Sequence, residues 1–278
     1  ARRRRVMKAI ASRDNPLVKR LHALSSSTRE RRKHGETLLD GAHLLDAALQ
    51  RQWPLKGVVV AESGLAGAEI QDLLSRCPAE VPRYRLSDAL FAHISPVDTP
   101  SGLVAIIDLP AEPAPEPLAS DVVVLDSVQD PGNLGTILRT AAAAGVREVL
   151  LTEGCASAWS PRVLRAGMGA HFGLRIRERV DALQALEGFP GTVLATALAP
   201  DARSLYDIDL GRPAAWLFGA EGQGLSPALL ALAAERVVIP LADGIESLNV
   251  AAAVAICLFE QARQRRALSA SHSSQGGD

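Results

Sequence analysis

Aromatic residues and cysteines are scarce in this sequence. Phe, Trp and Tyr make up 4% of the 278 residues, although 47% of the chain is hydrophobic. The cores must therefore be built mainly from Ala, Leu, Val and Ile, which suits helices packed on a parallel sheet. The three cysteines lie far apart, without a CxxC pair or a histidine at ligand spacing. This pattern argues against a disulfide framework and against a zinc site, so no metal is expected.

Long apolar runs are missing as well. The longest candidate, residues 248–259, is shorter than the roughly 20 residues that a bilayer span requires. The basic opening, residues 1–10, is not followed by an apolar core of signal-peptide length. We therefore expect a cytoplasmic protein with no membrane partner.

Positive charge is concentrated at the start of the chain. The formal net charge is −1, which argues against a generic nucleic-acid binder, yet residues 1–35 hold twelve Lys or Arg against only Asp14 and Glu30. Such clustering is typical of a surface that binds a polyanion, because each neutralised phosphate releases counterions. The alternative is a solvated, partly disordered arm.

A proline-rich stretch divides the chain. Residues 109–120 hold four prolines without helical or strand periodicity, as an extended linker does. Before it, the patterns predict a helix opened by Asn15 and Pro16, a strand and a helix over 36–50, a strand at 55–62 and a last strand within 98–107. We expect a basic arm with a small α/β domain over 1–108, a linker over 109–120, a second domain over 121–266 and a disordered tail over 267–278.

Five apolar, β-rich runs follow the linker, with helical patterns between them, at 122–126, 148–152, 192–196, 215–219 and 236–240. Apolar strands that alternate with helices predict an α/β fold with a parallel sheet covered on both faces. Ligands bind such sheets beyond the carboxyl ends of the strands. Unusual loops follow the first, fourth and fifth runs, so we expect the three loops to converge on one rim.

The first of these loops leads into a well-marked helix. Asn133 is expected to cap the helix, and Gly145 to end it in a left-handed conformation. Arg139 should project away from the core, because the apolar residues at core spacing are Leu134, Ile137, Leu138 and Ala141. Taken alone, Arg139 fits an ordinary exposed arginine as well as a functional one.

The second loop carries glycines at 219, 222 and 224 in the order GxxGxG, whereas a dinucleotide-binding fold opens with GxGxxG. It also contains Glu221, a poor neighbour for a phosphate. The loop therefore disfavours a pyrophosphate cofactor and suits a ligand with a cationic centre; the alternative is a purely structural turn. Ser226 and Pro227 then predict the start of a helix.

The third loop leads into the terminal helix. Ser247 and Asn249 lie at its start, where they either cap the helix or present a hydroxyl and an amide to the rim. The residues predicted to form its buried stripe are Leu248, Ala252, Ile256 and Phe259.

Three blocks together, residues 130–145, 217–226 and 239–260, resemble one family in order, spacing and residue identity. They are similar to the motifs of the TrmH/SpoU RNA 2′-O-ribose methyltransferases of the SPOUT class, over about residues 121–265. The first half is similar to the L30e-like substrate-binding domain of many members. The resemblance implies a SPOUT-type parallel sheet whose C-terminal segment forms a trefoil knot within about residues 215–255, a rare exception to unknotted topology.

The resemblance also implies S-adenosylmethionine (SAM) as the cofactor and a homodimer with the site near the subunit interface. The positions implied to bind SAM or to line its pocket are Thr196, Ala197, Gly219, Ile239, Leu241 and Leu248. The residues implied in catalysis are Asn133, Arg139, Glu221, Ser247 and Asn249. The residues expected to contact RNA are Arg13, Lys19, Arg20, Arg32 and Arg165.

The implied reaction is the attack of a weakly acidic 2′-hydroxyl on a sulfonium methyl, so the enzyme must position both groups and help a proton leave. In the family the residue matching Arg139 has been proposed as the base, but arginine stays protonated in proteins. We expect Arg139 to hold the adjacent phosphate and stabilise the developing alkoxide, with the phosphate or water taking the proton. Glu221 would orient Arg139, and the two asparagines and Ser247 would position the ribose.

Two positions depart from the family pattern, Gly167 and Ala251, where members often carry serine. Neither belongs to the proposed chemistry, so we expect an active enzyme. The predicted function is SAM-dependent RNA 2′-O-ribose methylation, with structured RNA as the partner and 23S ribosomal RNA favoured over tRNA. The alternatives are a tRNA 2′-O-methyltransferase and a non-catalytic RNA- or ribosome-binding protein, against which the retained motif residues argue.

Overall fold

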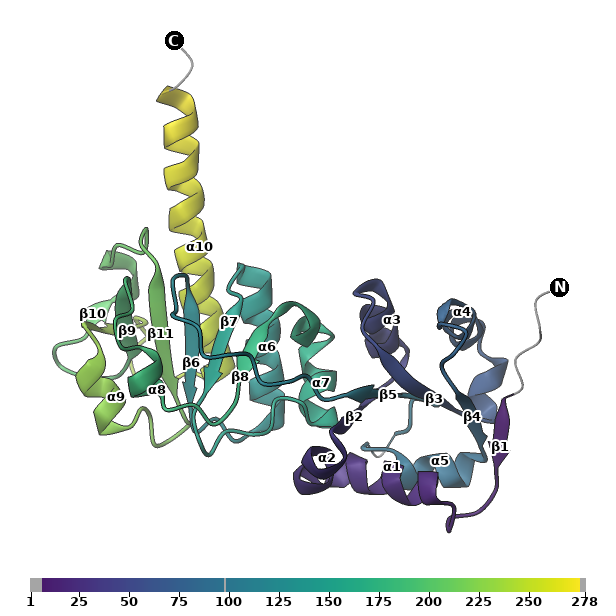
Figure 1. Cartoon of the computed structure of the whole chain (residues 1–278). Coiled ribbons are helices and arrows are strands. Elements are labelled where there is room, and N and C mark those ends of the chain that lie inside the picture. The colour runs from purple at the N-terminus through teal and green to yellow at the C-terminus, as the bar shows by residue number, and fades with distance from the viewer. Residues whose placement is uncertain (1–6, 98, 276–278) are drawn as a thin grey trace. The chain divides into compact units, whose positions relative to one another are not determined.

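The chain divides into two compact units (Figure 1). The structure is a computed structural model that describes residues 7–97 and 99–275, with the backbone alone at 270–275. Unit 1 ends at Ala111 and also includes Ser157–Phe172, whereas unit 2 comprises Glu112–Ala156 and the chain from Gly173 onward. The division falls in the proline-rich stretch, where residues 109–121 form neither helix nor strand. The sequence pattern did not predict that 157–172 would group with unit 1.

Within the described residues, unit 1 is built on a five-stranded mixed sheet in the order β1-β4-β3-β5-β2. Its strands are β1 (Lys8–Ile10), β2 (Glu36–Asp40), β3 (Leu55–Ala61), β4 (Arg83–Leu86) and β5 (Leu103–Asp108). Its helices are α1 (Pro16–Ser26), α2 (Thr28–His34), α3 (Ala42–Gln50), α4 (Ala68–Arg76), α5 (Asp88–Ile94) and α7 (Pro161–Gly167), with a short 3₁₀ turn, η1 (Ser63–Ala66).

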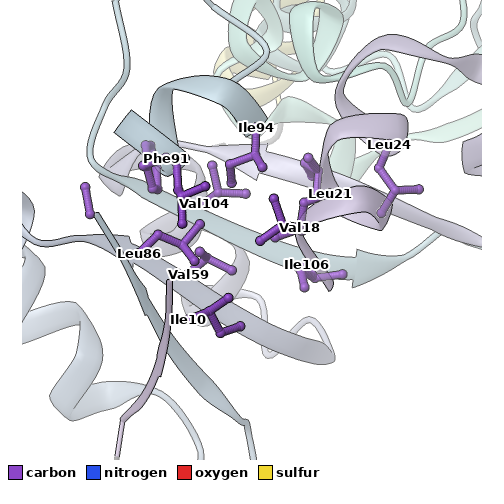
Figure 2. Close-up of a cluster of buried hydrophobic side chains, with 13 residues drawn as sticks. Ile10, Val18, Leu21, Leu24, Val59, Leu86, Phe91, Ile94, Val104 and Ile106 are labelled. Carbon is purple, nitrogen blue, oxygen red and sulfur yellow. The ribbon is translucent and has the colours of Figure 1, made fainter. Parts of the chain in front are cut away.

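The basic N-terminal region is folded where the structure describes it. Asn15 caps α1 by accepting a hydrogen bond from the Leu17 N–H, and Pro16 occupies the first helical position, as predicted. The apolar side of α1 packs into a buried cluster with β1, β3, β4, β5 and α5, shown in Figure 2. Residues 8–34 therefore form a strand and two helices rather than a solvated arm; residues 1–6 lie outside the described part.

A buried histidine makes unit 1 sensitive to acid. The His171 ring is 1% exposed, its Nε2 donates to the Ala158 carbonyl at 2.9 Å, and burial lowers its pKa to about 4. An unfolded histidine titrates near 6.5, so below that pH the unfolded chain binds a proton that the folded chain does not. Folding stability therefore declines as the pH falls from about 6.5 to about 4.

We expect this histidine to cost about 2 kcal/mol of unfolding free energy between pH 7 and pH 5. Denaturant unfolding at both pH values measures it. His171→Gln should flatten the decline, whereas His43→Gln, a change at an exposed histidine with no ion pair within the described residues, should leave it close to that of the wild type. An equal decline in His171→Gln would contradict the assignment.

In the described residues of unit 2, seven parallel strands form a sheet in the order β10-β12-β9-β11-β6-β7-β8. They are β6 (Val122–Asp126), β7 (Glu148–Leu151), β8 (Arg175–Arg177), β9 (Thr192–Thr196), β10 (Arg203–Ser204), β11 (Ala214–Gly219) and β12 (Glu235–Val238). The helices are α6 (Pro131–Ala144), α8 (Ala182–Ala185), α9 (Pro227–Leu232) and α10 (Val250–Gln275), with a 3₁₀ turn, η3 (Leu205–Asp207). A further 3₁₀ turn, η2 (Ala170–Gly173), belongs to unit 1 up to Phe172 and ends at the first residue of the second part of unit 2.

The predicted parallel sheet is confirmed, with helices on both faces. All five predicted strands are present with small shifts at their ends, and the two outermost strands, β8 and β10, are additional. One face of the sheet packs on α8 and α9, whereas Trp216 on the other face donates a hydrogen bond to Gln261 of α10. The predicted knot within residues 215–255 stays a prediction.

The predicted buried stripe of the terminal helix is wrong. Phe259 and Leu248 are 45% and 37% exposed, and the side chains that α10 buries are instead Val250, Ala251, Val254, Cys257, Leu258 and Gln261. Apolar residues fill nearly every position of the first three turns, so periodicity could not select the buried side.

The C-terminal end of α10 also differs from expectation. The helix continues through Gln275, although residues 267–278 were expected to be disordered. The sequence permits this continuation, because residues 250–275 contain no glycine or proline and include many residues that helices tolerate. In Figure 1, α10 extends well beyond the sheet of its unit. None of the helices in the described residues has an apolar stretch long enough to cross a membrane.

Candidate active site

The three loops predicted to share a rim do meet there. In a parallel sheet the carboxyl ends of all strands lie at one edge, and the loops after β6 and β11 and the start of α10 follow this edge. Together they bound an open pocket of about 260 Å³, whose lining includes Ser127, Asp130, Asn133, Glu221, Gln223 and Val250.

Two asparagines and a glutamate are joined at this pocket. Asn133 Nδ2 donates to Glu221 Oε1 at 2.9 Å, and Asn249 Nδ2 donates to the same oxygen at 2.8 Å. Asn249 Nδ2 also donates to Asn133 Oδ1 at 2.9 Å. We call these three residues the amide–carboxylate cluster. It brings one predicted catalytic residue from each of the three loops into direct contact.

The prediction that Asn133 caps α6 is wrong. Asp130 is the cap: its Oδ1 accepts the Asn133 N–H at 2.7 Å, and Pro131 occupies the first helical position. An aspartate followed by proline is a stronger start signal than an asparagine two residues inside the helix. Asn133 therefore lies in the first turn with its side chain available to Glu221. Gly145 ends α6 with φ 92°, as predicted.

Asn249 has both of the roles that the sequence left open. Its Oδ1 accepts hydrogen bonds from the Ala251 and Ala252 N–H groups at 2.9 and 3.2 Å, which caps α10. Its Nδ2 is the donor that joins the cluster. Ser247 is exposed and has no hydrogen bond to the cluster within the described residues.

Arg139 lies on the exposed side of α6, away from the buried residues of that helix, as predicted. Within the described residues it has no hydrogen bond or ion pair, so its guanidinium is available to a ligand. Glu221 bonds to the two asparagines, and its predicted role in orienting Arg139 stays a prediction.

The structure explains why the second loop contains three glycines. The Gly224 N–H donates to the Ala220 carbonyl at 2.9 Å, which closes a tight turn. A Cβ on Gly219 would lie 2.1 Å from the backbone carbon of Gly224, closer than any side chain can approach. Gly222 and Gly224 have φ of 82° and 69°. The turn presents Glu221 at its tip. The loop is therefore a structural turn, as one alternative had it, and also carries a residue of the candidate site.

The predicted cofactor residues gather at the same edge of the sheet. Thr196 and Gly219 end the adjacent strands β9 and β11, and Ile239 follows β12, the other neighbour of β9. Ala197 comes next to Thr196, and its N–H donates to the Val237 carbonyl at 3.1 Å. The remaining two predicted positions, Leu241 and Leu248, belong to the segment between β12 and α10. Contact of these residues with SAM stays a prediction.

The predicted RNA contacts all fall in unit 1, and their side chains differ in availability. Arg13 and Arg32 are exposed and have no partner within the described residues. Lys19 pairs with Asp14 at 2.9 Å, Arg20 Nε lies 3.6 Å from Glu36, and Arg165 pairs with the buried Asp40 at 3.1 Å. Within the described residues, no group of three His, Cys, Asp or Glu side chains is placed to hold a metal ion.

Known proteins are similar to this chain in both sequence and fold. The SpoU rRNA Methylase family matches residues 120–259, and the MRM3-like substrate binding domain matches residues 4–105. An uncharacterized tRNA/rRNA methyltransferase of Synechocystis is 38% identical over 94% of this chain and 96% of its own length. RlmP of Bacillus subtilis, a 23S rRNA (guanosine(2553)-2′-O)-methyltransferase, is 34% identical, with 91% and 98% covered. The AdoMet-bound rRNA methyltransferase of Sinorhizobium meliloti superposes with a TM-score of 0.80 at 30% identity, over 92% of this chain and 98% of that one.

Proposed function

Because the chain belongs to the SpoU rRNA methylase family, we propose that it transfers a methyl group from SAM to a ribose 2′-hydroxyl of 23S ribosomal RNA. The observation that carries the proposal is the amide–carboxylate cluster, which joins one residue from each of three rim loops beside an open pocket. The similarity to RlmP over nearly its whole length supports 23S ribosomal RNA as the substrate.

The donor set at the rim suits SAM. Thr196, Gly219 and Ile239 are only partly buried at this edge of the sheet, and the nearby Glu221 carboxylate complements a sulfonium cation. When bound, SAM supplies the electrophilic methyl group. These residues would hold it, while Gly219 lets the Gly224 backbone approach closely enough to form the turn that carries Glu221.

The chain's own residues then position the nucleophile. The asparagine side chains fix the Glu221 carboxylate through two N–H bonds, so the cluster presents a preorganised polar surface to the ribose. The unpaired Arg139 guanidinium would bind the phosphate next to the reacting ribose and stabilise the alkoxide that develops there. A phosphate oxygen or water accepts the proton, since arginine stays charged.

The direct experiment is transfer of labelled methyl from SAM to unmodified 23S rRNA fragments and tRNA transcripts, followed by mapping of 2′-O-methyl groups. Methylation of a 23S ribose is the expected result. Transfer to tRNA alone would move the substrate to the tRNA alternative, and transfer to a base would overturn the reaction class. The non-catalytic alternative requires that no SAM binding is detected by titration calorimetry.

Unit 1 supplies the proposed RNA-binding surface. Arg13→Gln and Arg32→Gln remove unpaired, exposed charges, so each is expected to weaken RNA binding and to lower the slope of log K against log salt by roughly 1. Binding titrations from 50 to 300 mM salt measure the slope. Arg76→Gln is the control, because Arg76 already pairs with Asp46 and Asp72. Slopes equal to that of the wild type would remove Arg13 and Arg32 from the RNA surface.

We also propose that two copies of the chain associate through α10. Of the residues that the sequence predicted to be buried, Ala252 and Phe259 are exposed on this helix and Leu248 is exposed just before it, and burial against a second copy would account for the apolar character of this surface. Sedimentation equilibrium tests the dimer.

A cytoplasmic location stays a prediction that follows from the proposed ribosomal RNA substrate.

A further inference from the structure

A buried aspartate lies beside the site without belonging to it. Asp126 ends β6, is 8% exposed, and is one of the few buried carboxylates in the described part of the chain. Neither the motifs nor the proposed chemistry gives this side chain a role. Its two oxygens are both bonded, and each bond reaches a different rim segment.

One oxygen holds the segment that carries Glu221. Asp126 Oδ2 accepts the Ser226 N–H at 2.8 Å, at the end of the loop that begins after β11. Gly219 at the start of that loop is already fixed, because it pairs with Asp126 in the β11–β6 ladder. Both ends of the loop therefore lie beside Asp126: Gly219 is its register partner in the ladder, and Ser226 is bonded to its side chain, so that the loop between them is held with Glu221 at its tip.

The other oxygen holds the segment that leads to Asn133. Asp126 Oδ1 accepts from Thr152 Oγ1 at 2.9 Å, and Thr152 Oγ1 in turn accepts the Ser127 N–H at 3.1 Å. Ser127 has φ 58°, a left-handed conformation that is costly for serine, and it lines the pocket with Asn133 and Glu221. The hydrogen bond from the Ser127 N–H supports this conformation at the point where the chain turns from β6 toward α6.

We propose that Asp126 is a positioning residue that sets the distance between Asn133 and Glu221, and thereby assembles the amide–carboxylate cluster. In this role it acts through the two rim segments that its side chain bonds. The inference rests on the proposed function of the cluster, but the placement of the two loops is a separate claim that does not depend on which RNA is methylated.

The test compares two substitutions. Asp126→Ala removes both acceptors and is expected to lower kcat about tenfold, since loss of alignment reduces rate without removing a reacting group. The Kd for SAM should change little, because the backbone ladder holds Gly219. Asp126→Asn should restore most of kcat: its oxygen can accept from Ser226, and its amide can donate to Thr152, whose hydroxyl can turn to the Glu153 carbonyl at 3.3 Å.

The matched control is Asp121→Ala, just before the other end of the same strand. Asp121 accepts from the Ala214 N–H and pairs with Arg265, so its loss removes a comparable set of bonds remote from the rim. We expect this variant to lose thermal stability while retaining kcat. An equal loss of kcat in Asp121→Ala would reduce the role of Asp126 to general stability and overturn the proposal.

Two further measurements separate positioning from other roles. In a double-mutant cycle, Asp126→Ala should add little to the kcat loss of Glu221→Gln, since Asp126 acts through the Glu221 carboxylate. Independent losses that multiply would overturn the proposal. An Asp126→Asn variant no more active than Asp126→Ala would also overturn it.

The side-chain amide NMR signals of Asn133 and Asn249 should shift in Asp126→Ala and remain in place in Asp126→Asn. Unchanged signals in both would refute the positioning role. This readout needs no methyl transfer, so it separates failure of the inference from failure of the proposed function.

Discussion

Arg139→Ala is expected to abolish most methyl transfer while leaving the fold and SAM binding intact. The guanidinium is exposed and unpaired within the described residues, so its loss removes no internal hydrogen bond or ion pair. If it stabilises charge that develops on the ribose oxygen, its removal costs roughly 10²–10³-fold in kcat, as for other preorganised donors of this kind. Single-turnover transfer at saturating RNA measures the chemical step, and calorimetry measures SAM affinity.

A lysine at the same position separates charge from geometry. Arg139→Lys keeps the positive charge but loses the planar fork that binds a phosphate through two parallel hydrogen bonds, so we expect only partial recovery. The control is Arg147→Ala, an exposed arginine just before β7, at the opposite edge of the sheet. Wild-type turnover in Arg139→Ala would exclude Arg139 from catalysis, and an equal loss in Arg147→Ala would indicate a general effect of charge on RNA binding.

Much of the sheet in unit 2 follows from the sequence, because its central strands are continuous apolar runs with clear breaks between them. The outermost strands did not follow, since β8 (Arg175–Arg177) and β10 (Arg203–Ser204) are short and polar and owe their conformation to a neighbouring strand. The assignment of residues 157–172 to unit 1 also depends on long-range contacts. Thr37 Oγ1 donates to the Trp159 carbonyl at 2.7 Å, and Trp53 packs on Trp159 and Phe172.

In the candidate site, the sequence indicated which residues take part but not how they contact one another. Motif resemblance selected Asn133, Glu221 and Asn249, but it could not show that they bond to one another, because 88 residues separate the first two in sequence. Asp126 carried no signal at all: it reads as the polar end of a strand. Only the fold reveals that its two oxygens reach two different loops.

Asn249→Ser is expected to lower kcat without a matching loss of stability. The serine hydroxyl can still accept from the first N–H groups of α10, since serine is as good a helix cap as asparagine. It supplies neither of the N–H bonds that Asn249 gives to Asn133 and Glu221. A hydrogen bond to a charged group contributes about 1.5–3 kcal/mol, so we expect kcat to fall about tenfold to a hundredfold.

Asn249→Ala removes the cap as well as the donor. It should show the same loss of kcat together with about 1 kcal/mol of lost unfolding free energy, the usual cost of a missing cap. Time courses of methyl transfer and thermal unfolding, measured on both variants, therefore separate the role of Asn249 as a helix cap from its role as a donor to the cluster. Asp181→Ala supplies the reverse control, because Asp181 caps α8 through the Leu183 and Gln184 N–H groups and takes no part in the cluster.

These three variants distinguish a catalytic asparagine from a structural one. If the cluster positions the ribose, kcat follows the Nδ2 donor and is low in both Asn249 variants, whereas stability follows the cap and is low in Asn249→Ala and Asp181→Ala. Wild-type kcat in Asn249→Ser would mean that capping is the whole contribution of Asn249. In that case Glu221 would be held by Asn133 alone, and the contact between the third loop and the other two would be a by-product of where α10 begins.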